Sequence, residues 1–357
     1  MNELKSTPPV PAPEVRQFLS HVAAEFVRVP FRPLRFFTGG HAQTIVSYVW
    51  PRRSKLQATD PERYFQVAPE DKLLAHCRWQ SNPKENPTLV LWHGMEGSTS
   101  SIYMLAIAQK AFSIGFNIVR VNLRNCGGTE HLTPTLYHGG LSQDLRAVLT
   151  ELIETDELKR ICLIGYSLGG NLVLKLGGEL AENPPAELLA ICAISPSVDL
   201  GASATEICKR SNWIYHRDFR RRMLNRIHVK KRHFPDRYDL TNIKSVRTIR
   251  DFDERFTSRA HGFDGAEDYY FKASSIRTMH QIRVPTLIVH AKDDPFIPFA
   301  PLQNPALTEN PYILFIATEQ GGHIAFVGEQ RNDEDRFWAE NRAVQFCKLA
   351  VEDLGQY

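Results

Sequence analysis

The most restrictive feature of this sequence is the stretch 161–170, which reads Ile-Cys-Leu-Ile-Gly-Tyr-Ser-Leu-Gly-Gly. An apolar run ends at Gly165, Ser167 follows two residues later, and a helical pattern begins directly after it. Gly165-x-Ser167-x-Gly169 matches the G-x-S-x-G elbow, in which a buried strand turns sharply into a helix and lifts a serine clear of the sheet. Small residues are needed because flanking side chains would collide with the neighbouring strand and helix. The context favours Ser167 as a nucleophile.

Segments typical of strands and helices alternate on both sides of this elbow. The expected strands cover 64–67, 73–79, 88–92, 116–122, 160–164, 188–194, 286–290 and 312–317, and the expected helices cover 13–27, 102–113, 142–154, 168–181 and 333–351. Such alternation predicts a mostly parallel sheet with helices on both faces. The helix at 13–27 is amphipathic, and we expect its apolar face to pack on the domain rather than on a membrane.

The alternation is interrupted between residues 200 and 275, where aromatic and basic residues accumulate instead. The basic cluster consists of Arg217, Arg220, Arg221, Arg222, Arg226, Lys230, Lys231 and Arg232. Because the segment lies between two sheet strands, we predict a helical cap over the C-terminal edge of the sheet. The expected division is an N-terminal extension with an irregular arm (1–60), a core in two parts (61–199 and 276–357) and the cap (200–275).

Composition and charge exclude several classes of function. The net charge of +3 over 357 residues gives no indication of nucleic-acid binding, and no stretch approaches the ~20 apolar residues of a membrane span. The six scattered cysteines are typical of reduced core thiols, and the polar, proline-rich start does not resemble a signal peptide. We therefore expect a cytoplasmic protein. With no H-E-x-x-H motif or clustered ligand set, we expect neither a metal nor a cofactor.

The basic cluster allows two interpretations. It is either a solvated helix face or a surface that attracts anionic lipid headgroups or a CoA-type phosphate, which would allow peripheral membrane contact. The oligomeric state is not readable from the sequence.

A serine hydroxyl is a weak nucleophile near neutral pH and needs a base, which itself needs an orienting acid. His323 follows the last expected strand and two glycines, so its loop can bring the imidazole to Ser167 as the general base. Three carboxylates could serve as the acid. Asp293 and Asp294 follow the strand at 286–290, and Asp199 follows the strand before it.

The negative charge that develops during attack on a carbonyl requires an oxyanion hole. One donor should be the backbone N–H of Leu168, directly after the nucleophile. The second should come from the loop 93–98, His-Gly-Met-Glu-Gly-Ser, and we assign it to the N–H of Met95. Loss of one such donor typically costs ~3 kcal/mol of transition-state stabilisation.

Five segments together resemble the YheT-like branch of the α/β-hydrolase superfamily: Gly40-His41-Ala42-Gln43-Thr44, 93–98, 122–128, 165–171 and 293–295. This branch includes abhydrolase-domain lipases and acyl-CoA:alcohol acyltransferases. The resemblance implies the α/β-hydrolase fold and a triad in the order Ser, acid, His. It favours Asp294 as the acid, with Asp293 capping the turn. His41 could be read as catalytic, but we expect it to hydrogen-bond the arm onto the core. Two positions depart from this branch: it often has Asn where this chain has Gly39, and Gly where this chain has Asn125.

These observations predict a serine hydrolase that cleaves carboxylic esters with short- to medium-chain or lipid-like acyl groups through an acyl-enzyme. Its partner would be a small-molecule ester. One alternative is acyl transfer to an alcohol with the same triad. Another is a binding scaffold without catalytic activity.

Overall fold

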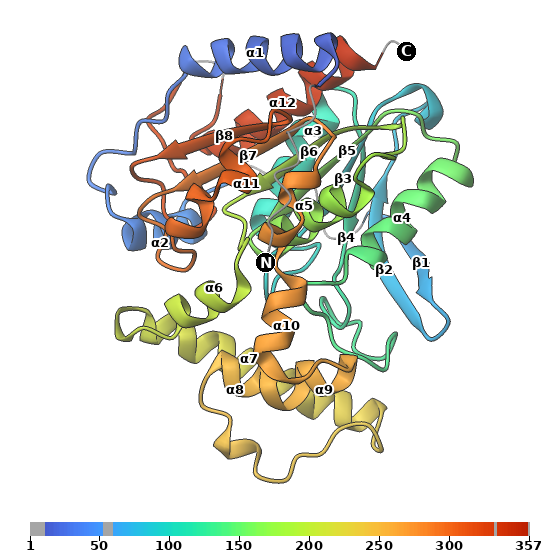
Figure 1. The fold of residues 1–357 in the computed structure, drawn as a ribbon, viewed down its shortest axis with the longest axis vertical. Helices are drawn as coiled ribbons and strands as arrows, with labels where there is room; N and C mark the ends of the chain where they lie inside the picture. The colour runs from blue at the N-terminus through green and yellow to red at the C-terminus, as the bar shows by residue number, and fades with distance from the viewer. Residues whose placement is uncertain (1–10, 53–59, 332–333, 356–357) are drawn as a thin grey trace, which may run out of the picture.

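The computed structural model describes residues 11–52, 60–331 and 334–355, and it contains one eight-stranded sheet within these ranges (Figure 1). The strand order is β1-β2-β4-β3-β5-β6-β7-β8. The strands are β1 (Glu62–Ala68), β2 (Asp71–Arg78), β3 (Thr88–Trp92), β4 (Asn117–Val121), β5 (Ile161–Tyr166), β6 (Leu188–Ile194), β7 (Thr286–Ala291) and β8 (Ile313–Thr318). β1 pairs antiparallel with β2, and β2 with β4, whereas all other pairs are parallel. The predicted mostly parallel sheet is confirmed.

Helices cover both faces of this sheet, and each face has its own hydrophobic core. Successive side chains of a strand point to opposite faces, so Val90 and Trp92 of β3 join one core while Leu89 and Leu91 join the other. The first core includes α4 (Ser142–Glu154) and α5 (Leu168–Leu180), and the second includes α1 (Pro13–Val27), α3 (Ile102–Ser113) and α12 (Trp338–Leu354). Burial on both faces explains why the parallel strands are continuous apolar runs.

The amphipathic helix α1 has the bounds expected from the sequence and packs on the domain. In Figure 1 it lies across α12, and the rings of Phe18 and Phe346 are 5.3 Å apart between centroids. No helix among the described residues is both long enough and apolar enough to cross a bilayer.

Two expectations about the ends of the chain were wrong. The arm expected to be irregular contains a ten-residue helix, α2 (Gly40–Val49). The glycines at its start, Gly39 and Gly40, made this segment resemble a loop. The last helix was expected from Asp333, which lies outside the described residues, and the described helix begins at Trp338. The helix begins further along the chain than expected because Phe337, the residue before it, forms a β-bridge with Val327.

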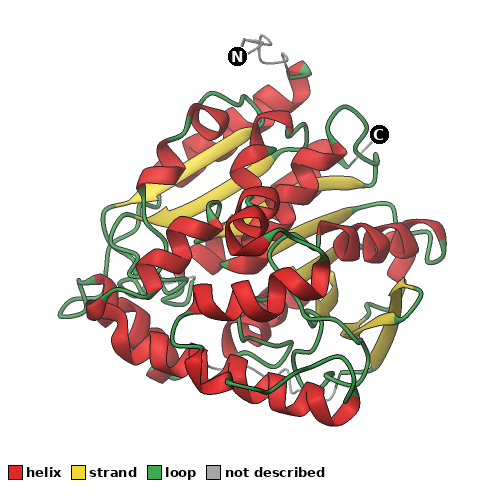
Figure 2. Cartoon of the chain, turned by 60° about the horizontal axis from the view of Figure 1, so that its bottom comes forward, coloured by secondary structure: helices red, strands yellow, loops and turns green. Residues whose placement is uncertain are grey.

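The segment between β6 and β7 is helical, as expected, and is called the insertion (residues 200–275) here. It contains α6 (Leu200–Ile207), α7 (Trp213–His233), α8 (Ile249–Phe252), the π-helical turn Asp253–Thr257, α9 (Ser258–His261) and α10 (Gly265–Ala273). These helices gather at one end of the molecule, and Figure 2 shows them coming forward below the sheet. A short helix, α11 (Pro305–Thr308), follows β7. The predicted domain boundaries stay a prediction.

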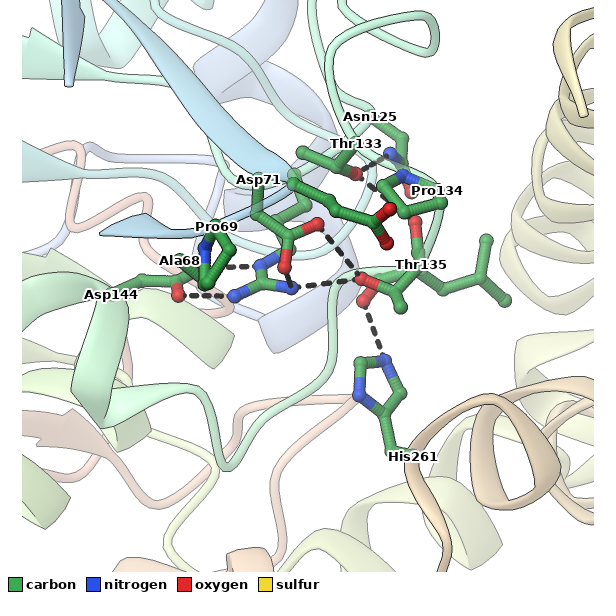
Figure 3. Close-up of polar contacts among 12 residues, drawn as sticks. Ala68, Pro69, Asp71, Asn125, Thr133, Pro134, Thr135, Asp144 and His261 are labelled. Carbon is green, nitrogen blue, oxygen red and sulfur yellow. Dashed lines mark hydrogen bonds and ion pairs between the residues drawn. The ribbon is translucent and has the colours of Figure 1, made fainter. Parts of the chain in front are cut away.

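The loop after β4 is fixed to the core and to the insertion (Figure 3). The buried Arg124 guanidinium donates hydrogen bonds to Asp144 at 2.7 and 2.5 Å and to Asp71 at 2.6 Å. His261 of α9 contacts the Leu136 carbonyl at 2.8 Å. Asn125 has a left-handed φ of 60°, a conformation that suits glycine and that asparagine also tolerates. This explains why an asparagine can stand there.

Candidate active site

Ser167 lies on the sharp turn between β5 and α5. Its φ of 52° and ψ of −114° are strained for a residue with a side chain, and strain of this kind clusters at functional sites. A Cβ on Gly165 would collide with the Gly169 carbonyl, and one on Gly169 would lie 2.5 Å from the Trp92 oxygen. The turn therefore requires glycine on both sides of Ser167, as expected for the elbow.

His323 and Asp294 form a direct hydrogen bond. Nδ1 of His323 donates to Oδ2 of Asp294 at 2.8 Å, and the backbone N–H groups of Phe296 and Ile297 donate to Oδ1 at 2.8 and 3.1 Å. Burial opposes ionisation of this carboxyl. The charge of His323 and its hydrogen bond outweigh burial and hold the pKa of Asp294 below its ordinary value. Asp294 is therefore a carboxylate at neutral pH.

The other two candidate acids have different partners. Asp293 accepts a hydrogen bond from the N–H of Gly322 at 2.9 Å, so it holds the loop before His323 and does not contact its ring. Asp199 caps α6 by accepting from the N–H of Ala202 at 2.9 Å. Of the three carboxylates, the structure joins only Asp294 to the imidazole.

Ser167 and His323 lie at the same edge of the sheet, beside the end of β6. The N–H of Ser167 donates to the Ile194 carbonyl at 2.9 Å, and the N–H of Ile324 donates to the hydroxyl of the next residue, Ser195, at 3.1 Å. Within the described residues, neither Ser167 Oγ nor His323 Nε2 makes a hydrogen bond. The contact between nucleophile and base thus stays a prediction.

The loop 93–98 is held against Ser167 by its buried first residue. His93 Nε2 accepts from the N–H of Leu123 at 3.0 Å, so Nδ1 carries the proton and donates to the Gly94 carbonyl at 2.7 Å. Burial lowers the pKa of His93 to about 4, so the ring is neutral. A Cβ on Gly94 would lie 3.0 Å from the Ser167 Cβ, which shows how closely the loop approaches.

Two backbone N–H groups near Ser167 are available to a ligand. Among the described residues the Met95 N–H has no hydrogen-bond acceptor, whereas the Gly94 N–H before it is taken by the Tyr103 hydroxyl at 3.0 Å. The N–H of Leu168 is the first of α5, where a helix has no carbonyl of its own to offer. The arrangement suits an anion at the helix N-terminus.

Comparison with known proteins agrees with this geometry. The family described as the alpha/beta hydrolase fold matches residues 87–330. The chain belongs to the α/β hydrolase fold family. It is 30% identical to the YheT protein of Escherichia coli over 335 residues, which cover 92% of this chain and 95% of that protein. The expected resemblance to the YheT-like branch is therefore confirmed.

Two further relatives of this hydrolase carry names of ester-cleaving enzymes. The monoacylglycerol lipase of Saccharomyces cerevisiae is 29% identical over 304 residues, covering 82% of this chain and 64% of that protein. An esterase of Pyrococcus furiosus matches in structure with a TM-score of 0.53 and 14% identity, covering 85% of this chain and 97% of that one. This structural match shows the fold alone. The expectation of a carboxylic ester hydrolase agrees with these names.

A pocket opens beside Ser167 in this hydrolase. Met95, Ser167 and Leu168 line one side. The insertion supplies most of the remaining wall with apolar side chains, among them Leu200, Ile207, Met223, Ile249, Phe252 and Tyr269. The wall can therefore accommodate an apolar chain whose reactive end lies at Ser167.

The sequence did not reveal two charged residues in this wall, Arg226 and Asp253. The expected basic cluster is not one surface, because Arg226 and Lys230 are buried on the inner side of α7. Lys230 Nζ donates to the Glu130 carbonyl at 3.0 Å, and Arg226 pairs with Glu96 at 2.7 Å. The helical spacing of Met223, Arg226 and Lys230 was the signal that could have placed them inward.

The arm helix α2 supports the loop of His323. Gln43 exchanges hydrogen bonds with the backbone of Val327 at 3.0 and 2.8 Å, and Thr44 accepts from the N–H of His323 at 2.9 Å. His41 is exposed and stacks on Tyr215 at 5.8 Å between centroids, and the described residues give it no hydrogen bond. The expectation for His41 was wrong, because Gln43 and Thr44 join the arm to the core.

Proposed function

We propose that this hydrolase cleaves carboxylic esters with an apolar acyl group through an acyl-enzyme on Ser167. The observation that carries the proposal is the largely apolar pocket that opens on this serine. The hydrogen bond between Asp294 and His323 supports it, because it is the contact that an orienting acid and a general base require. The name of the yeast lipase points to the same class of substrate.

The first half of the proposed reaction acylates the serine. Asp294 accepts a hydrogen bond from Nδ1–H of His323, which leaves Nε2 free to take the proton from Ser167 as Oγ attacks the carbonyl carbon. The N–H groups of Met95 and Leu168 stabilise the oxyanion. When the tetrahedral intermediate collapses, His323 gives its proton to the departing alcohol and the acyl group remains on Ser167.

The second half releases the acid. His323 removes a proton from water, the hydroxide attacks the acyl-enzyme carbonyl, and the same two N–H groups stabilise the second oxyanion. Collapse returns the proton to Ser167 and frees the carboxylic acid. If an alcohol occupies the place of water, the same steps transfer the acyl group to it, so hydrolysis and transfer differ only in the acceptor.

The test is a series of p-nitrophenyl esters from acetate to palmitate, with wild type and Ser167→Ala compared at each length. We expect wild-type turnover to depend on chain length and the variant to lose at least ~10³-fold in kcat. Equal rates for the two proteins would refute the role of Ser167. Absence of wild-type turnover across the series would favour a binding scaffold, and a predominance of ester over acid with added alcohol would favour acyl transfer.

We also propose that any peripheral membrane contact uses only the exposed part of the basic cluster. Arg217, Arg221 and Arg222 are exposed on the outer side of α7, whereas Arg226 and Lys230 are buried. Exposed arginines attract anionic lipid headgroups. Sedimentation with anionic vesicles, compared with neutral ones, tests this, and equal binding to both would contradict it. The cytoplasmic location stays a prediction.

A further inference from the structure

We propose that Arg226, on the insertion helix α7, is a positioning residue for the oxyanion hole. It acts through Glu96, which directly follows Met95 in the loop 93–98. The inference rests on the proposed function, because it assigns Arg226 a part in the ester chemistry at Ser167.

Both carboxylate oxygens of Glu96 are held by side chains from outside its loop. Nη2 of Arg226 donates to Oε2 at 2.7 Å, and the hydroxyl of Tyr137 donates to Oε1 at 2.8 Å. The Arg226 guanidinium also lies 4.9 Å from the centroid of the Tyr137 ring. The Arg226 and Glu96 side chains are 9% and 4% exposed, so water does not compete for these bonds. Three chain segments therefore meet at one buried carboxylate.

The backbone of Glu96 explains why such an anchor is needed. Its φ of +59° lies in the left-handed region, which is uncommon for a residue with a side chain. A conformation of this kind persists only where the surrounding structure determines it. The turn itself contributes one backbone bond, from the N–H of Gly97 to the Gly94 carbonyl at 3.0 Å. His93 and Tyr103 hold the Gly94 side of the Met95 peptide, and the side-chain anchor of Glu96 holds the other side.

Arg226 is buried beside an apolar pocket, where its Nη1 also donates to Sγ of Cys126 at 3.1 Å. Removing an ion pair from water is costly, and apolar residues of similar volume often stabilise a protein as well or better. The pair at this position fixes one arrangement of the chain. The position of the insertion on the core therefore determines the direction of the Met95 N–H. A displacement of this donor by about 1 Å can cost ~10²-fold in rate.

The experiment compares Arg226→Met and Arg226→Lys with Arg259→Met, a control at an exposed position on helix α9 of the same insertion. We expect Arg226→Met to lower kcat by about 10- to 100-fold at every acyl length, with KM changed by less than about 3-fold. A trifluoromethyl ketone, which forms an oxyanion with the serine, should lose affinity by a similar factor. Arg226→Lys should recover part of both losses, and Arg259→Met should match wild type.

Arg226 also lines the pocket, so its alternative role is that of a wall residue. A change in KM or in chain-length preference, with kcat and ketone affinity preserved, would overturn the inference while leaving the proposed function intact. If Arg226→Met does not fold, Tyr137→Phe and Glu96→Gln carry the same prediction, and unchanged kcat in both would overturn it. A wild-type protein without activity on any ester would instead refute the proposed function.

Discussion

The Thr44 hydroxyl accepts a hydrogen bond from the backbone N–H of His323 at 2.9 Å, across 279 residues of sequence. The same hydroxyl donates to the Gly40 carbonyl at 2.7 Å, so it is fixed within α2. The arm helix thereby supports the loop that presents the imidazole. Helix α2 is part of the site even though none of its side chains is proposed to react.

Thr44→Val tests this support. Valine keeps the shape of the side chain but leaves the buried His323 N–H without an acceptor, which costs about 1–3 kcal/mol of stability. We expect kcat to fall about 10-fold, because a small misplacement of a catalytic group costs this much or more. Thr44→Ser retains the acceptor and should stay close to wild type in both thermal unfolding and kcat. Equal behaviour of the two variants would show that the bond is dispensable.

The close approach of α2 to the acid-bearing loop gives a second prediction. A Cβ on Gly40 would overlap the backbone oxygen of Asp293, whereas one on Gly39 would meet nothing within 4 Å. Gly39 also has an ordinary φ of −100°. We expect Gly40→Ala to lower stability by about 2 kcal/mol or more and to reduce activity, and Gly39→Ala to stay within about 0.5 kcal/mol. Urea unfolding of both variants measures the difference, and similar values would contradict the packing described.

The fold was largely readable from the sequence because local patterns determine it. Thr88–Trp92 and Leu188–Ile194 have the predicted bounds, since a continuous apolar run bounded by turn residues is typical of a strand buried on both faces. Strand order and the antiparallel pairing of β2 with β4 depend on contacts distant in sequence, which no local pattern shows. Helix α2 was missed for the same reason, because Gln43 and Thr44 are anchored to partners 284 and 279 residues away.

The candidate site was readable only in part. Motif context singled out Ser167, His323 and Asp294, and the structure brings the last two into contact. The pairing of Arg226 with Glu96 joins residues 130 positions apart, so neither spacing nor charge pattern could reveal it. The basic cluster was misread as one surface because its charges were counted without regard to which side of α7 each one occupies.

The choice between neighbouring carboxylates gives a third prediction. Asp294→Asn removes the acceptor of the His323 Nδ1 proton, and we expect kcat to fall about 10³- to 10⁴-fold, as in other triads that lose their acid. Asp293→Asn keeps an oxygen for the Gly322 N–H and should lose less than about 10-fold. Steady-state kinetics on one ester measures both. A larger loss in Asp293→Asn than in Asp294→Asn would reverse the assignment.

The buried Asp253 in the pocket wall gives a prediction about pH. Burial raises the pKa of its carboxyl to about 6, although the hydroxyls of Thr257 and Tyr270 donate to it. The pKa of an Asp in the unfolded chain is about 3.9. Between pH 4 and 6 the folded state therefore binds more protons than the unfolded state, so the contribution of Asp253 to stability falls as pH rises through that window. The free energy of unfolding falls by about 3 kcal/mol in all across this window.

Asp253→Asn cannot ionise and should escape this loss. We expect its stability relative to wild type to increase between about pH 4 and 6 and to level off above. Urea midpoints across this range measure the effect, and Asp236→Asn at an exposed position serves as the control. A stability difference between Asp253→Asn and wild type that does not change with pH would show that Asp253 has no raised pKa.

The central claim is that Ser167 is the nucleophile, and covalent labelling by a fluorophosphonate tests it most directly. Such a probe reacts with a serine that is activated by a base, and intact mass spectrometry counts the adducts. We expect one adduct on wild type, located at Ser167, and none on Ser167→Ala, with slower labelling of His323→Ala. Equal labelling of wild type and Ser167→Ala would contradict the account.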